Sequence, residues 1–207
     1  MMQGMWGKKI GMTQLFSEAN KVVPVTAVDM SCWRVVRIKT KSKDGYSAIQ
    51  IGCVRDSFVE HEFSSDWLVD CRKYFSVLRE VPVTNDDHGI VVGHIADIAS
   101  VVNQGDTVDV SGLTIGRGFQ GAVKRHGFSG GRASHGDRLG RGPGALSFMR
   151  SQGRVPKGKK MPGHMGVERC TVKNVEIVRI DPSVSVVFIK GSVPGKTGSL
   201  VFVRKVG

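Results

Sequence analysis

The chain has 207 residues, of which 40% are hydrophobic and 23% charged, and its formal net charge is +12 at neutral pH. This length and apolar content fit one folded domain with an insertion and exclude a fully disordered chain. No apolar run reaches the ~18 residues of a membrane-spanning helix, and the N-terminus lacks the apolar stretch of a signal peptide. We therefore expect a soluble, intracellular protein with no membrane partner.

The residue types that usually carry chemistry are scattered. None of the four cysteines (Cys32, Cys53, Cys71 and Cys170) lies in a Cys-x-x-Cys pair, and the six histidines show no metal-ligand spacing. No group of Ser, Cys or carboxylate residues suggests catalysis. We expect reduced structural thiols, no metal, no cofactor, no small-molecule substrate and no enzymatic activity.

The first half of the chain predicts short strands. Gly7–Phe16 reads as two small basic turns around a short apolar stretch. Three β-branched runs then follow and indicate strands, at Val22–Met30, Trp33–Lys39 and Tyr46–Val54. Pro24 argues for a strand start or a sheet edge, and Lys43-Asp44-Gly45 is a turn signal.

Residues 56–100 differ in character and are predicted to be an insertion of mixed α/β structure. Apolar residues recur at near-helical spacing between Asp66 and Arg79, with Asp66 as a plausible cap, so a helix is expected there. Strand patterns return at Asp106–Val110, Arg169–Ile180, Val184–Lys190 and Ser199–Lys205. Five or six strands with short turns suggest a mainly β fold, a small closed or half-open barrel built from residues 1–115 and 167–207.

Residues 116–166, here called the arm, carry most of the net charge. The arm holds eleven Lys or Arg residues and one acid, Asp137, and therefore contributes +10 of the net +12; it also holds fourteen of the 27 glycines. Such a segment buries too little apolar surface to offset an ordering cost of about 1–2 kcal/mol per residue. A polyanion, most economically RNA, would supply the missing free energy.

Two other functions of the arm are weighed against RNA binding. Gly116-Arg117-Gly118-Phe119-Gln120-Gly121 matches the Gly-x-Gly-x-x-Gly pattern of nucleotide-binding enzymes, but no βαβ unit or suitably placed ribose-binding acid accompanies it. Binding to an anionic membrane surface would need an amphipathic helix, which the glycines break. The arm's three aromatic residues could stack on bases or anchor the arm to the barrel or to a local turn. Anchoring is favoured for Phe119 and Phe128, whereas base contact is favoured for Phe148, which lies among polar and basic residues.

Several segments resemble the family of large-subunit ribosomal protein three. They are Gly7–Phe16 (GKKIGMTQLF), Gly116–Arg125 (GRGFQGAVKR), Ser134-His135-Gly136, Gly142-Pro143-Gly144, Lys157–Gly166 (KGKKMPGHMG), Arg169–Val172 and Val193-Pro194-Gly195. The resemblance runs nearly end to end, is weakest across residues 56–100, and looks bacterial.

The resemblance implies a six-stranded barrel of the translation-factor type whose long glycine-rich basic loop penetrates the large-subunit rRNA toward the peptidyl transferase centre. It also implies a cytoplasmic ribosomal protein, early assembly onto 23S rRNA near its 3′ end, and neighbouring large-subunit proteins as partners. A glutamine that can be N-methylated in the family falls on Arg150 here, which would instead add a cation at the deepest point of the arm. The expected rRNA-binding residues are Lys8, Lys9, Arg117, Lys124, Arg125, Arg132, His135, Arg138, Arg141, Phe148, Arg150, Arg154, Lys157, Lys159, Lys160 and His164.

Overall fold

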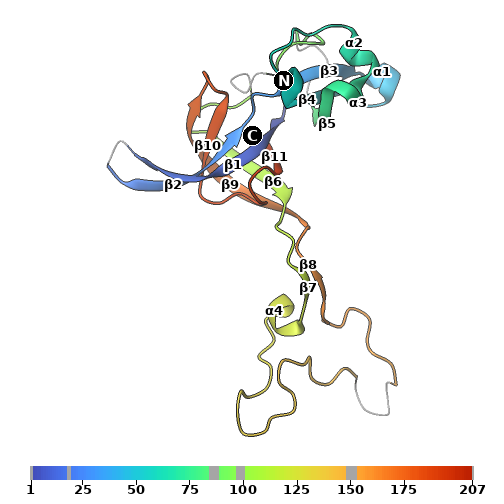
Figure 1. Cartoon of the computed structure of the whole chain (residues 1–207), viewed down its shortest axis with the longest axis vertical. Helices are drawn as coiled ribbons and strands as arrows, with labels where there is room; N and C mark the ends of the chain where they lie inside the picture. Colours follow the sequence, from blue (N-terminus) through green and yellow to red (C-terminus); the bar gives the residue numbers. More distant parts are fainter. Residues whose placement is uncertain (1, 18–19, 84–88, 97–100, 148–152, 207) are drawn as a thin grey trace. The chain divides into compact units, whose positions relative to one another are not determined.

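A computed structural model describes residues 2–17, 20–83, 89–96, 101–147 and 153–206 (Figure 1). The chain divides into two compact units. Unit 1 comprises Met1–Leu113 and Arg169–Gly207, and unit 2 comprises Thr114–Glu168. These boundaries lie two residues from those predicted for the arm.

Six strands of unit 1 close into a ring in the order β1-β11-β6-β9-β10-β2, and every neighbouring pair is antiparallel. The strands are β1 (Gly4–Phe16), β2 (Val22–Asp29), β6 (Thr107–Leu113), β9 (Arg169–Asp181), β10 (Val186–Lys190) and β11 (Leu200–Lys205). Strand β1 is long enough to pair with β11 through residues 4–8 and with β2 through residues 8–16. A register shift between Lys9 and Gly11 separates paired segments of β1.

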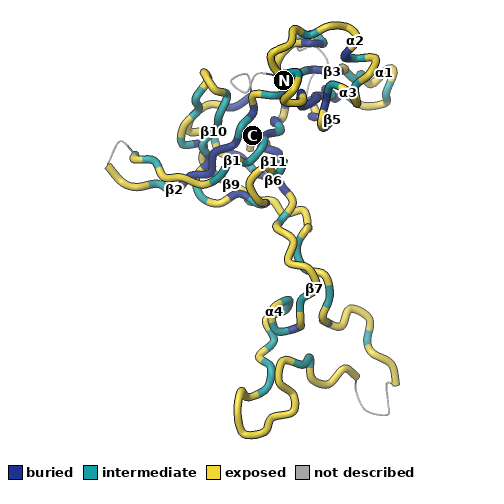
Figure 2. The backbone as a smooth tube through the Cα atoms, in the orientation of Figure 1, coloured by how far each residue is buried: buried dark blue, intermediate teal, exposed yellow. Residues whose placement is uncertain are grey.

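Alternate residues of these strands form the core of the ring (Figure 2). Val108 and Val110 of β6, Val187 and Ile189 of β10, and Val201 and Val203 of β11 are all fully buried. Burying such a side chain contributes about 1.5–3 kcal/mol, so the period-two apolar pattern accounts for which faces of these strands turn inward.

A second sheet of unit 1 packs on the same core. Its order is β3-β4-β5, from β3 (Trp33–Lys39), β4 (Ala48–Val54) and β5 (Phe75–Pro82). Trp33, Ile49, Ile51 and Val81 of this sheet belong to the hydrophobic cluster that includes the ring core. The short elements α1 (Lys41–Asp44), η1 (Asp56–Phe58), α2 (Asp66–Val69) and α3 (Cys71–Tyr74) connect its strands. Trp67 and Phe75 form a smaller cluster with Val36 and Val54.

The predicted turns at Gly7–Phe16 are wrong, because these residues continue strand β1. The glycines that lowered the strand signal are required by close packing. A Cβ atom on Gly7 would lie 2.5 Å from Cγ1 of Val28, and one on Gly4 would press against the backbone of β11. Glycine at these positions thus lets neighbouring strands of the ring approach each other closely.

The predicted helix between Asp66 and Arg79 is also wrong. Two single helical turns, α2 and α3, are separated at Asp70, whose φ of −108° and ψ of 58° are not helical, and β5 follows from Phe75. The N-cap of α2 is Ser65 and not Asp66, and it makes no side-chain capping bond. Pairing with β4 along seven residues outweighs the weak helical spacing of this segment.

The other predicted strands are confirmed within a few residues of their ends, but Trp33–Lys39 and Ala48–Val54 lie in the three-stranded sheet and not in the ring. The segment outside the ring therefore begins before residue 56. Among the described residues, no helix has the length and apolar character needed to cross a bilayer.

Candidate nucleic-acid interface

The two ends of unit 2 are joined by backbone hydrogen bonds. The Thr114 N–H donates to the Glu168 carbonyl (2.9 Å), and the Arg117 N–H donates to the Met165 carbonyl (2.9 Å). A three-residue antiparallel ribbon continues this pairing, with β7 (Gly118–Gln120) against β8 (Gly163–Met165). Gly166 has a φ of +83°, and a Cβ there would press on the Ile115 carbonyl, so the close pairing at this root requires glycine.

Helix α4 (Ala122–His126) follows the ribbon and is hydrogen-bonded to the segment that leads back into β8. The Arg125 guanidinium donates from Nη1 to the Met161 carbonyl (2.8 Å), and the His126 ring Nε2 lies 3.0 Å from the same oxygen. Gly127, with a φ of +72°, ends the helix by donating its N–H to the Val123 carbonyl. Helix α4 is thus little more than a single turn, beginning at Ala122.

The single acid of the arm organises the loop after α4. Asp137 accepts the Arg132 N–H at 2.6 Å and the Leu139 N–H at 2.8 Å. These two backbone hydrogen bonds, first that from Leu139 and then that from Arg132, lower the pKa of Asp137 from its ordinary value. A backbone bond from Gly131 to the Gly140 carbonyl (2.6 Å) closes the loop. Asp137 therefore holds the shape of the loop through these backbone hydrogen bonds. The sequence shows it only as the one acid of the arm and gives no sign of this role.

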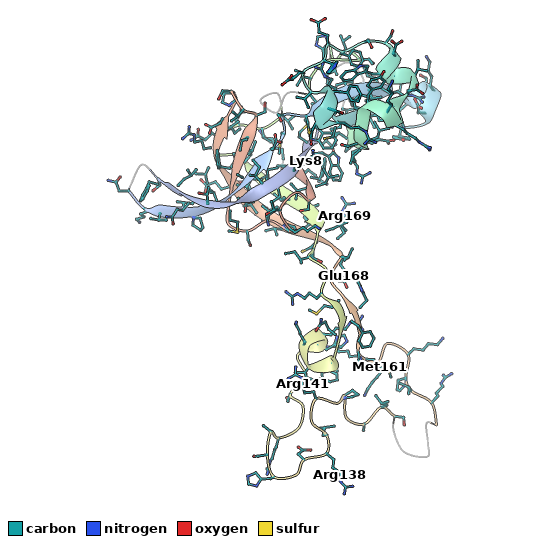
Figure 3. All side chains as sticks on the ribbon, in the orientation of Figure 1. Lys8, Arg138, Arg141, Met161, Glu168 and Arg169 are labelled. Carbon is teal, nitrogen blue, oxygen red and sulfur yellow. The ribbon has the colours of Figure 1, made fainter. Side chains whose placement is uncertain are left out.

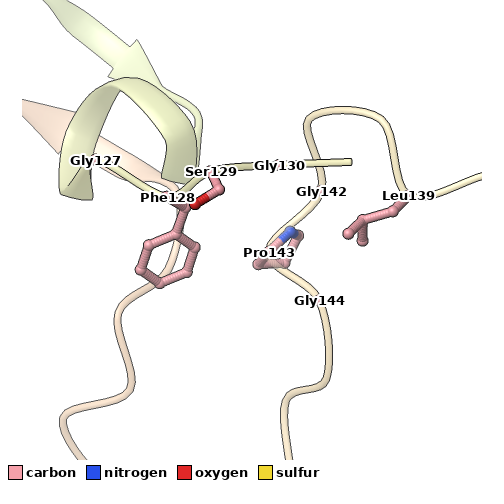
Figure 4. Close-up of a pocket in the computed structure, with 8 residues that line it drawn as sticks. All are labelled: Gly127, Phe128, Ser129, Gly130, Leu139, Gly142, Pro143 and Gly144. Carbon is pink, nitrogen blue, oxygen red and sulfur yellow. The ribbon is translucent and has the colours of Figure 1, made fainter. Parts of the chain in front are cut away.

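A shallow hollow lies between this loop and the end of α4 (Figure 4). It has a volume of about 390 Å³, and the side chains of Phe128, Leu139 and Pro143 face it, with glycines completing its wall. The Phe128 ring is half-buried, and its centre lies 6.0 Å from that of His126. The expectation that Phe128 anchors the arm locally agrees with this position.

Phe119 does not anchor the arm, contrary to expectation. Its side chain is 77% exposed, on β7 directly opposite His164, which is exposed as well. The physical reason is that unit 2 has almost no apolar core, since Ala122 is the one buried residue among those described in it. Cross-strand placement of an aromatic ring and an imidazole makes a surface on which an unstacked base could lie.

The side chains expected to bind rRNA are distributed along all segments of unit 2 (Figure 3). Arg117 precedes the ribbon, Lys124 and Arg125 lie on α4, and His164 lies on β8. The loop after α4 carries Arg132, His135, Arg138 and Arg141, and residues 153–162 carry Arg154, Lys157, Lys159 and Lys160. Phe148 and Arg150 lie outside the described residues.

These cations are presented to solvent. Arg125 is half-buried, and the remaining Lys and Arg side chains described in unit 2 are exposed. The ion pairs found among the described residues all lie in unit 1, so none neutralises a described arm cation. A surface of this kind binds a polyanion by displacing its counterions.

Lys8 and Lys9 lie on β1 of unit 1 and are half-buried. The Lys9 ammonium donates to the carbonyls of Val193 (2.8 Å) and Gly195 (2.9 Å), and so holds the loop between β10 and β11. Lys9 thus has a structural role that its sequence context did not reveal.

The Gly-x-Gly-x-x-Gly match lies on the antiparallel ribbon and ends at Gly121, the N-cap of the five-residue helix α4. The enzyme alternative required a parallel βαβ unit, and this geometry is different. Within the described ranges, no cluster of three or more His, Cys, Asp or Glu side chains is arranged to hold a metal ion.

Comparison with known proteins identifies the family. The family model for ribosomal protein L3 matches residues 86–185. The chain is 42% identical to large ribosomal subunit protein uL3 of Geotalea daltonii over 208 residues, covering 99% of this chain and 97% of that protein. It is 42% identical to the uL3 protein of Nitrosomonas europaea (97% and 95% covered) and 41% identical to that of Pelotomaculum thermopropionicum (99% and 97% covered). The chain therefore belongs to the ribosomal protein L3 family, a family of structural ribosomal proteins and not of enzymes.

Proposed function

We propose that the chain is a structural constituent of the large ribosomal subunit that binds 23S rRNA directly through unit 2. The observation that carries the proposal is the run of exposed cations without acidic partners among the described residues of Thr114–Glu168. Arg side chains fork onto phosphates and stack on bases, and the glycines let the backbone approach the nucleic acid closely.

The six-stranded ring serves as the anchor in this proposal. It is a barrel of the translation-factor type that docks on the subunit surface, whereas unit 2 threads between packed rRNA helices toward the peptidyl transferase centre. The protein joins 23S rRNA early in assembly and contacts neighbouring large-subunit proteins in the cytoplasmic ribosome. Family membership supports this role, as do the fastened turns of unit 2, which reduce the backbone freedom lost on binding.

The test is the salt dependence of binding between the full-length protein and a 23S rRNA fragment. If five or six arm cations contact phosphate, log affinity falls against log salt with a slope of roughly −3.5 to −5. Replacing Lys157, Lys159 and Lys160 with Gln should reduce the magnitude of the slope by about 2–3, at ~0.7–0.9 per contact. An affinity that does not change with salt would contradict the proposal.

The matched control replaces three lysines of unit 1, Lys39, Lys190 and Lys205, with Gln. Their ammonium groups already pair with Glu80 (2.6 Å), Glu176 (2.8 Å) and Asp106 (2.7 Å) in the free protein. The control should leave the slope close to that of the native chain. An equal loss in control and arm variants would assign binding to overall charge and not to unit 2.

A further inference from the structure

Two cysteines of unit 1 meet where β3 begins and β4 ends. Cys32 immediately precedes β3, and Cys53 pairs in register with Trp33, so the two thiols are diagonal neighbours. Their sulfur atoms are 2.7 Å apart, against about 2.05 Å for a disulfide bond. The Val54 N–H donates to the Cys32 carbonyl at 2.8 Å and fixes the backbone on both sides of the pair.

The surroundings of the pair distinguish its two members. Cys53 is fully buried in the core shared by the ring and the second sheet, whereas Cys32 is half-buried and accessible to small solutes. The ammonium of Lys8 on β1 lowers the pKa of both thiols. A cation beside a thiol stabilises the thiolate, which is the nucleophilic form.

The two sulfurs share one hydrogen bond, and either of them can be its donor. This hydrogen bond lowers the pKa of Cys53 against the opposing effect of burial, and Ser76 and Lys8 act in the same direction. Once the pair has lost one proton, the remaining proton can lie on either sulfur. Cys32 is the sulfur that a solute can reach, so it is the one that meets the oxidant.

We propose that Cys32 and Cys53 form a redox-responsive dithiol, which hydrogen peroxide converts reversibly into an intramolecular disulfide. In the first step Cys32, as the thiolate, attacks a peroxide oxygen, an S–O bond forms, the O–O bond breaks, and hydroxide leaves and becomes water on protonation. In the second step Cys53, losing its proton, attacks the Cys32 sulfur, an S–S bond forms, the S–O bond breaks, and a second water leaves. The two thiols lose two electrons, which reduce the peroxide to two molecules of water.

The test treats the full-length protein with hydrogen peroxide, alkylates the remaining thiols and maps the peptides by mass spectrometry. The chain has four free cysteines. The expected result is a fall from four alkylated thiols to two, a mass decrease of two hydrogen atoms before alkylation, and a cross-linked Cys32–Cys53 peptide. Dithiothreitol should restore all four thiols. Oxidation of the exposed Cys170 with Cys32 and Cys53 still alkylated would overturn the proposal, as would over-oxidation of Cys32 without a cross-link.

Three variants examine the roles of the two sulfurs and of Lys8. Cys53→Ser removes the second step, so dimedone should trap a sulfenic acid at Cys32. Lys8→Met should slow disulfide formation several-fold, because the thiolate loses its cation. The control, Cys71→Ser with Cys170→Ser, should oxidise at the native rate. An unchanged rate in Lys8→Met would remove Lys8 from the proposal, and the native-chain experiment decides the disulfide itself even where a variant folds poorly.

Discussion

Arg125 donates a hydrogen bond from its guanidinium to the Met161 carbonyl, 36 positions along the chain, at 2.8 Å. This contact joins helix α4 to the segment that leads into strand β8. The cation is thus used inside the free protein, while Lys124 on the same helix is exposed. The difference between these neighbouring cations gives a direct test of order within unit 2.

Arg125→Ala should loosen residues 161–165, which comprise β8 and the residues just before it. Hydrogen bonds to charged groups contribute about 1.5–3 kcal/mol when buried, and we expect roughly 1 kcal/mol here because the side chain is half-exposed. Hydrogen exchange of the amides at residues 161–165 should then be about fivefold faster. Lys124→Ala, which removes the same charge, is the control and should leave those amides unchanged; equal acceleration in both variants would show that charge alone matters.

Order of the loop after α4 should depend on pH through Asp137. The pKa of Asp137 in the folded protein lies below its ordinary value of 3.8 because the carboxylate accepts the N–H groups of Leu139 and Arg132. A depressed carboxyl pKa gives order that is present above pH 3.8 and is lost as the pH falls through the folded value. Protection of the Arg132 and Leu139 amides, measured by NMR against β11 amides, should fall in that range.

Asp137→Ala provides the reference for this experiment, since it should show low protection of both amides at every pH. If the native chain keeps its protection at a pH where NMR shows the Asp137 carboxyl to be protonated, another contact and not the carboxylate must hold the loop.

Gly7→Ala should destabilise the ring. The new Cβ would lie 2.5 Å from Cγ1 of Val28 and 2.9 Å from the backbone carbonyl oxygen of Asp29, so β2 must shift. Overpacking of this kind costs about 1–3 kcal/mol, which urea denaturation would detect as a lower midpoint. Gly11→Ala, on the same strand with open space around the added Cβ, should change stability by less than about 0.5 kcal/mol. Similar midpoints for the two variants would refute the packing argument.

Lys9→Met should also lower the urea midpoint. The substitution leaves the Val193 and Gly195 carbonyls without their ammonium donor, and we expect a loss of about 1–3 kcal/mol. The control is Lys41→Met, since that side chain is exposed on α1. A midpoint equal to that of the native chain would show that these two hydrogen bonds do not stabilise the fold. Lys9 would then be counted only as a cation expected to bind rRNA.

The positions of strands could be predicted well where the apolar pattern was strong. Arg169–Ile180 shows apolar residues among polar ones, Trp33–Lys39 is rich in β-branched residues, and both segments are strands. β1 could not be predicted, because its glycines lower strand propensity and their value appears only when β2 and β11 lie against them. The segment after Asp66 has apolar residues that fit both periods, and the free edge of β4 decides in favour of a strand.

The candidate site shows the same division between local pattern and three-dimensional context. The density of charge in the sequence was enough to locate the cations of unit 2, because a segment that binds a polyanion needs no particular partner residue within its own chain. The exposure of Phe119 and the backbone bonds of Asp137 depend on which segments return beside them, and a linear pattern carries no such information. The Lys9 contacts likewise join residues more than 180 positions apart.

Leu113 and Arg169 are paired in register at the end of the β6–β9 ladder, so the intervening 55 residues leave and re-enter the ring at one rung. Shortening, lengthening or replacing these 55 residues alters no hydrogen bond of the closed sheet. The sequences of the ring and of unit 2 are therefore free to diverge at different rates. A tight hairpin that replaces unit 2 between Leu113 and Arg169 should yield a ring that still folds.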